Sequence, residues 1–321
     1  MNFQLLSDNL TNPALLFFVL GIIAVYLRSD LEIPSNSSKF ISIYLLFSIG
    51  FKGGQELSHE TIDREILYCF ILGLSSSILI PYYTFYLLKT KLKLHDAGAI
   101  AASYGSVSAV TFVTASAYLE GLGQHLEGHM VAVMALMESP AIIVGLLMVS
   151  LYSKQENEVN NNKSKTLSHA MTNGSVLLII GSLLIGFITT TKHAEGIKPF
   201  TNDIFKGFLA IFLLDMGIMS GRKLNSMFSY GSFPLLFALI IPLLNGCLMA
   251  YLANYFVESI ANRFILAVLA ASASYIAVPA AMKIANPKAD PGLYLPMPLA
   301  LTFPMNITLG FPIYYSIATY F

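Results

Sequence analysis

The chain is poor in charge, in cysteine and in tryptophan. Only 11% of its 321 residues are Asp, Glu, Lys or Arg, against roughly 25% in a typical soluble protein. With 55% hydrophobic residues and a mean hydropathy of +0.68, the composition predicts a polytopic membrane protein. The formal net charge of zero offers no basic face for nucleic acid. The two cysteines both lie in apolar runs, which excludes a disulfide framework.

The chain also lacks the motifs of several enzyme classes. GSVS at 105–108 is not the G-x-S-x-G elbow of serine hydrolases. All six histidines lie in loops or at the ends of apolar segments, so none could activate a serine at membrane depth. His125 and His129 are four residues apart without the H-E-x-x-H pattern of a zinc site. No Gly-rich phosphate loop is present. We therefore expect neither an enzyme nor an ATP-driven pump.

Ten apolar segments are present, five in each half of the chain. A helix needs about 17–25 residues to cross a bilayer. The candidates are residues 13–27, 39–57, 65–88, 97–119, 130–152, 172–190, 204–221, 232–255, 262–283 and 296–319. The long polar segment 153–168 separates the fifth from the sixth. We expect an all-α polytopic membrane protein, with a five-helix repeat at 1–152, a linker at 153–168 and a second repeat at 169–321.

The two halves share short stretches of sequence at a constant offset. SIGFKGGQEL at 48–57 aligns with DMGIMSGRKL at 215–224, which places Gly50 over Gly217 (217 − 50 = 167). Residues 99–110 match residues 267–278 at an offset of 168, and the same shift places Glu138 over Asn306. Because each half has an odd number of spans, the second half would enter the membrane from the opposite side. The sequence predicts an inverted repeat.

The basic residues of the short loops predict the orientation. Cytoplasmic loops carry an excess of Lys and Arg. Twelve lie in one set of loops and four in the other, so we expect both termini outside and the linker in the cytoplasm. The twelve are Arg28, Lys39, Lys89, Lys91, Lys93, Lys154, Lys163, Lys165, Arg222, Lys223, Lys283 and Lys288, and the four are Arg64, Lys192, Lys198 and Arg263.

Two apolar segments, 99–119 and 267–282, carry polar residues and helix breakers at their centres. Each serine alone could bond to its own helix, but the mirrored clusters predict interrupted helices around a binding site. The N-terminus of the second half-helix suits a small anion, and carbonyls with hydroxyls suit Na⁺. The expected substrate-binding residues are Gly105, Ser106, Ser108, Thr111, Ser272 and Ser274.

A few charged residues lie inside the apolar segments, where they need a cavity or a partner. Lys52 could approach an anion, but we expect it to reach the interface with Glu56 as its partner. Asp215 is expected to pair with Lys52 or Lys206 in a structural role. Glu138 could be a cation ligand, a proton-coupling group or a structural carboxylate. The expected Na⁺ site consists of Ser108, Glu138, Ser274, Asn306 and Thr308.

Five motifs follow one another along the chain: GFKGG at 50–54, YGSVSAVT at 104–111, MESPA at 137–141, AASASYIAVPA at 270–280 and ANPKADPGLY at 285–294. By these the chain resembles the sodium-dependent bicarbonate transporter family of bacteria. The resemblance implies two broken helices that cross at the midplane. A core of helices 3–5 and 8–10 would move like an elevator against a gate of helices 1, 2, 6 and 7. It also implies a homotrimer in the bacterial inner membrane and a PII-like cytoplasmic regulator.

The chain departs from that family pattern at a few positions. Where the pattern runs S-S-S-D, this chain has Ser272-Ala273-Ser274-Tyr275, so that a phenol replaces an acid. Glu138 stands where the family has Asp, and Asn306 where a small residue is common. We predict a secondary active transporter of a small anion, with Na⁺-coupled bicarbonate uptake as the first interpretation. The alternatives are a symporter of another small anion or carboxylate, coupled to Na⁺ or H⁺, and a transporter-like ligand sensor.

Overall fold

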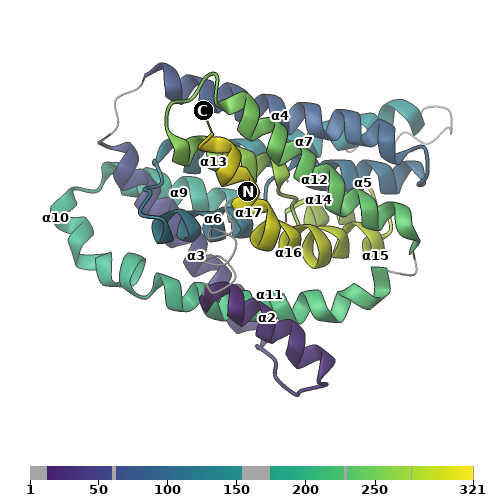
Figure 1. The fold of residues 1–321 in the computed structure, drawn as a ribbon, viewed down its shortest axis with the longest axis horizontal. Coiled ribbons are helices and arrows are strands. Elements are labelled where there is room, and N and C mark those ends of the chain that lie inside the picture. Colours follow the sequence, from purple (N-terminus) through teal and green to yellow (C-terminus); the bar gives the residue numbers. More distant parts are fainter. Residues whose placement is uncertain (1–12, 60–62, 154–173, 228–229, 276, 321) are drawn as a thin grey trace.

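The computed structural model describes residues 13–59, 63–153, 174–227, 230–275 and 277–320, and within these ranges it is helical, with no strand (Figure 1). Helices lie in all ten predicted segments. The predicted linker lies outside the described residues, apart from Ser153. The first half contains α2 (Pro13–Tyr26), α3 (Ser35–Leu57), α4 (Arg64–Leu88), α5 (Leu94–Gly105), α6 (Ala109–Gly121) and α7 (His129–Ser153).

The second half begins with regular helices and ends in an irregular one. It contains α9 (Gly174–Ile188), α11 (Phe205–Met227), α12 (Ser232–Ala253), α13 (Ile260–Ala271) and α14 (Ala277–Ala285). Three short helices, α10 (Thr191–Ala194), η1 (Glu195–Ile197) and η2 (Pro199–Asp203), join α9 to α11. The predicted last span alternates between α and π geometry through α15 (Pro291–Tyr294), η4 (Met297–Thr302), α16 (Phe303–Met305), η5 (Asn306–Gly310) and α17 (Phe311–Ala318).

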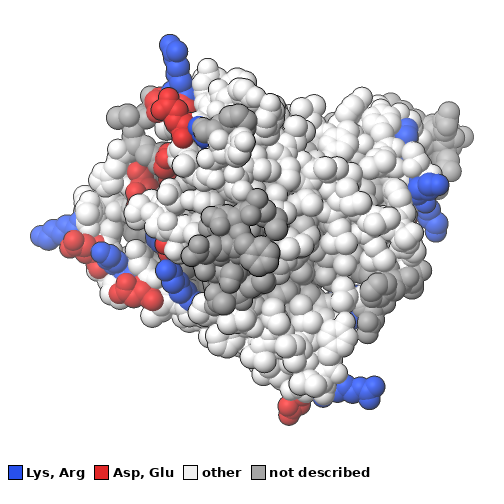
Figure 2. Space-filling model, in the orientation of Figure 1, with Lys and Arg blue, Asp and Glu red and all other residues white. Residues whose placement is uncertain are grey.

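Within the part of the chain that the structure describes, five helical segments are long and apolar enough to cross a membrane. They are Arg64–Leu88, Leu94–Gly121, His129–Ser153, Pro199–Leu224 and Ser232–Ala253, and three shorter apolar helices accompany them within the described ranges. On the face that Figure 2 shows, the charged side chains of the described residues lie towards the ends and edges of the molecule, with a broad uncharged band between them. This distribution is that of a multi-pass membrane protein.

Two pairs of helices, each joining one half of the chain to the other, pack closely through glycine. Helix α3 packs on α9, and α2 packs on α11. A Cβ added at Gly54 would lie 2.1 Å from the Leu183 backbone oxygen, and one at Gly217 would lie 2.0 Å from the Phe18 backbone oxygen. Small residues let membrane helices approach this closely, so that dispersion contacts form along their length.

The remaining helices form a second group, with α4, α5 and α7 in contact with one another and α12 in contact with α13 and α17. The two interrupted segments, α5–α6 and α13–α14, lie inside this group (Figure 1). In the Leu94–Gly121 segment 89% of the apolar window is buried, compared with 33% in Ser232–Ala253. The interrupted segments therefore form the centre of the molecule, and helices such as α12 form its outer layer.

Candidate site between two interrupted helices

The first interruption separates α5 from α6. Helix α5 ends at Gly105, where an added Cβ would lie 2.3 Å from the Pro81 ring, so this glycine allows α4 to pack against the break. Ser108 is extended and caps α6, because its Oγ accepts a hydrogen bond from the Thr111 N–H at 3.2 Å. The first N–H groups of a helix have no partner inside it. The N-terminus of α6 is therefore a small group of donors at the break.

The second interruption separates α13 from α14. Helix α13 ends at Ala271, whose carbonyl accepts a hydrogen bond from the Asn306 Nδ2 at 2.8 Å. The Tyr314 hydroxyl donates in turn to the Asn306 Oδ1 at 2.8 Å. The Ser274 Oγ accepts a hydrogen bond from the Val278 N–H at 3.4 Å, near the start of α14. The irregular C-terminal segment thus supplies a partner for the free end of α13.

The two interruptions are hydrogen-bonded to each other. The Ser108 N–H donates to the Ser272 Oγ at 3.1 Å, and the Ser274 N–H donates to the Ser103 carbonyl at 2.8 Å. The Ser106 Oγ also donates to the Glu138 carbonyl on α7 at 3.3 Å. These bonds satisfy backbone groups that the breaks release, which a membrane interior requires. The two breaks therefore lie side by side and are held together by hydrogen bonds.

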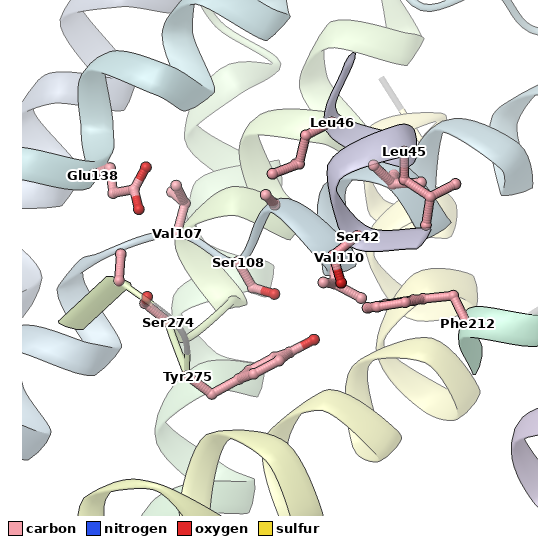
Figure 3. Close-up of a pocket in the computed structure, with 13 residues that line it drawn as sticks. Ser42, Leu45, Leu46, Val107, Ser108, Val110, Glu138, Phe212, Ser274 and Tyr275 are labelled. Carbon is pink, nitrogen blue, oxygen red and sulfur yellow. The ribbon is translucent and has the colours of Figure 1, made fainter. Parts of the chain in front are cut away.

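A cavity lies between the interruptions and helices α3 and α11, and it offers about 40 Å³ to the centres of water-sized molecules (Figure 3). One water needs roughly 10–15 Å³ of such space, so the cavity can hold a few waters or one small ion. Among the residues that the structure describes, Glu138 is the only acidic or basic one that lines it. The lining comprises Ser42, Leu45, Leu46, Val107, Ser108, Ala109, Val110, Val113, Glu138, Phe212, Ser274, Tyr275 and Ala277.

A model of the Na⁺-dependent bicarbonate transporter superfamily matches residues 13–319. The chain belongs to this superfamily. No curated protein matches the chain. Membership agrees with the apolar helices in indicating a multi-pass membrane transporter, with sodium as the coupled ion and a small anion such as bicarbonate as the substrate class.

The structure brings three of the predicted site residues of this transporter together at the cavity: Ser108, Glu138 and Ser274. Their carboxylate and hydroxyl oxygens are the ligand types that suit Na⁺. The described residues contain no cluster of three His, Cys, Asp or Glu that could hold a metal ion. A sodium site here would therefore depend on hydroxyl and backbone oxygens beside the single carboxylate.

The other predicted site residues lie around the cavity rather than in its lining. Ser106, Thr111 and Ser272 are buried in the interruptions, and Gly105 packs on Pro81. Thr308, in the C-terminal segment, donates its hydroxyl to the Pro304 carbonyl at 2.7 Å. Asn306, as described above, binds the end of α13. The roles of all these residues in binding stay predictions.

Some lining residues were not predicted from the sequence. Ser42, Leu45 and Leu46 come from α3 and Phe212 from α11. These side chains sit in ordinary apolar stretches, so no local pattern distinguishes them. Tyr275 is different, because the sequence marked it as a departure from the family pattern.

The expected partners of the intramembrane charges were wrong. Lys52 pairs with Glu120 at 3.0 Å and not with Glu56, and Lys206 pairs with the same Glu120 at 3.5 Å. Asp215 accepts a hydrogen bond from the Ser38 hydroxyl and pairs with neither lysine. The reason is distance along α11, since Lys206 and Asp215 are nine residues, or about 13 Å, apart. The end of α6 places Glu120 between the two lysines.

Proposed function

We propose that the chain is a Na⁺-coupled bicarbonate transporter and that the cavity at the two interruptions is its binding site. The observation that carries this proposal is a cavity in which the only charged lining residue, among those that the structure describes, is an acid. Two like charges about 5 Å apart repel by roughly 3 kcal/mol at an effective dielectric constant of about 20. An anion would therefore enter beside an ionised Glu138 only when a cation accompanies it. Transport in which the anion can cross only together with a cation is symport.

The arrangement of the helices supports transport by an elevator movement. One wall of the cavity comes from α3 and α11, which belong to the glycine-packed pairs, and the other comes from the interruptions and α7. We propose that the pairs are the fixed gate, and that the second group is the core that carries the site past them. Ten spans in two inverted repeats, with both termini outside, complete this proposal. The homotrimer and the PII-like regulator rest on the family resemblance alone.

The proposed site residues can be tested through uptake. We expect the double variant Ser106→Ala/Ser274→Ala to reduce ¹⁴C-bicarbonate uptake into proteoliposomes at least tenfold. It removes the hydroxyl bonded to the Glu138 carbonyl and a hydroxyl in the cavity. The amount of folded protein is checked by gel filtration. Unchanged uptake by a well-folded double variant would contradict the site.

Proton coupling is the second candidate, because the carboxyl group of Glu138 lines the cavity and a carboxyl group can carry a proton. The substitution Glu138→Gln separates the two mechanisms, since glutamine keeps the shape but can neither ionise nor carry a proton. For Na⁺ coupling we expect uptake to lose its dependence on the Na⁺ gradient. Proton coupling would be favoured if uptake by Glu138→Gln no longer depended on pH and if Na⁺ had no effect on uptake by the unmodified chain. Glu56→Gln, on an exposed residue at the end of α3, is the matched control and should change neither dependence.

A further inference from the structure

The hydroxyl of Tyr275 is buried in the cavity without a partner. The side chain is 8% exposed and lines the cavity, and its hydroxyl makes no hydrogen bond with the described residues. The ring is held from behind by an edge contact with Phe303, with 6.2 Å between the centroids. A buried tyrosine hydroxyl usually finds a partner, because leaving one unsatisfied costs about 1–3 kcal/mol. The missing partner is expected to be a ligand.

The polar groups near this hydroxyl are not hydrogen-bonded to it. The Ser108 hydroxyl lies beside it, but the two do not reach hydrogen-bonding geometry. The Ser42 hydroxyl, on α3, donates to the Ser38 carbonyl at 2.9 Å. The first residues of α6, Ala109 and Val110, also line this part of the cavity. Their free N–H groups add further donors.

The cavity therefore has two chemically different ends. In Figure 3 the Glu138 carboxylate lies on one side of Ser108, and the hydroxyls of Ser42, Ser108 and Tyr275 point into the space on the other side. Negative charge is favoured at a helix N-terminus such as that of α6. The donor end thus suits an anion, and the carboxylate end suits a cation.

We propose that the Tyr275 hydroxyl donates a hydrogen bond to the transported anion, together with the N-terminus of α6. This inference rests on the proposed function and adds a residue that determines which anion binds. The ligand class is a small oxyanion with a single charge, because the donors are few and no basic side chain is among the described lining residues. Because the phenol is neutral, Glu138 stays the single fixed charge among those residues, so that one cation can lie between the carboxylate and the anion.

The substitution Tyr275→Phe removes only the hydroxyl. A hydrogen bond to a charged group contributes about 1.5–3 kcal/mol, so we expect the KM for bicarbonate to rise at least tenfold. The Na⁺ concentration for half-maximal uptake, measured at saturating bicarbonate, should change less than threefold. Tyr104→Phe is the matched control, because Tyr104 is also buried but its hydroxyl is bonded to Thr302 at 2.7 Å, and neither residue is among those that line the cavity. Its KM should stay within twofold. A KM for Tyr275→Phe within twofold of the unmodified chain would overturn the inference.

A binding measurement separates this inference from the proposed function. Bicarbonate, nitrate, formate and chloride are each added to detergent-solubilised protein in a buffer that contains Na⁺. The rise in Tm is recorded for the unmodified chain and for Tyr275→Phe. If bicarbonate is not transported but an oxyanion raises Tm only when the Tyr275 hydroxyl is present, the substrate assignment fails and the inference stands. If oxyanions raise Tm equally in both chains, or none raises it in the unmodified chain, the inference fails. Should Tyr275→Phe not fold, Tyr275→Leu tests the same loss of a donor.

Discussion

At the scale of single residues, Glu138 and Asn306 make different contacts. The predicted repeat aligns the two positions (306 − 138 = 168). Glu138 lines the cavity, whereas Asn306 uses its amide to bond the Ala271 carbonyl and the Tyr314 hydroxyl. One half thus supplies charge to the site, and the other half supplies support for its broken helix.

We expect Asn306→Leu to destabilise the protein by about 1–3 kcal/mol, because the buried Ala271 carbonyl and the Tyr314 hydroxyl would both lose their partner. Thermal unfolding in detergent would show this as a lower Tm. Thr114→Val is the control, since the Thr114 hydroxyl bonds only the Val110 carbonyl of its own helix and should change Tm little. An unchanged Tm in Asn306→Leu would show that the carbonyl finds another partner.

At the scale of helices, glycine decides which surfaces meet. An added Cβ at Gly186 would lie 2.2 Å from the Phe51 backbone oxygen, and one at Gly21 would lie 2.3 Å from the Leu214 backbone oxygen. Contacts with backbone atoms cannot be relieved by a side-chain rotation. The pairs α3–α9 and α2–α11 must therefore separate if a larger residue is introduced.

We expect Gly54→Ala to lower the free energy of unfolding by about 1–3 kcal/mol, as overpacking typically does, because its Cβ would meet the Leu183 oxygen at 2.1 Å. Gly181→Ala on α9 is the matched control, since an added Cβ there meets nothing within 4 Å. Alanine favours helix over glycine, so this control should leave Tm unchanged or raise it. Equal effects of the two substitutions would contradict the packing account.

The sequence predicted elements better than contacts. Hydropathy located the ten helical segments, and Ser and Gly clusters located both interruptions, because each of these features depends only on residues close together in the sequence. The predicted partners of Lys52 and Asp215 were wrong, because the residues that contact them, Glu120 and Ser38 respectively, come from distant parts of the chain. The contributions of Ser42 and Phe212 to the cavity were missed for the same reason. The interrupted helices pointed to a small anion and Na⁺, and the family resemblance added bicarbonate as the expected anion.

At the scale of the whole molecule, the proposed movement requires that gate and core slide past each other where they touch. Helix α3 of the gate meets α7 of the core at Gly53, where an added Cβ would lie 2.9 Å from the Val131 Cβ. Within the core, an added Cβ at Gly98 on α5 would lie 3.5 Å from the Val149 Cβ on α7. A disulfide needs about 3.5–4.5 Å between Cβ atoms. The pair Gly98 and Val149 meets this distance, and the pair Gly53 and Val131 reaches it when α3 and α7 move apart by about 0.6 Å (3.5 − 2.9).

We expect the pair Gly53→Cys/Val131→Cys, once oxidised, to lose most uptake and to recover it on reduction. The pair Gly98→Cys/Val149→Cys should keep its uptake when oxidised, because both residues would move together. The two native cysteines, Cys69 and Cys247, form no disulfide and are replaced by alanine in both variants. Normal uptake by the fully oxidised Gly53→Cys/Val131→Cys variant would exclude an elevator movement of α7 past α3.

The most direct test of the central claim is ¹⁴C-bicarbonate uptake into proteoliposomes, with and without an inward Na⁺ gradient at constant pH. The account predicts that bicarbonate accumulates above its outside concentration only when the Na⁺ gradient is present. This accumulation should be lost when a Na⁺ ionophore dissipates the gradient. Uptake that is the same when K⁺ replaces Na⁺, or absent from folded protein, would contradict Na⁺-coupled bicarbonate transport.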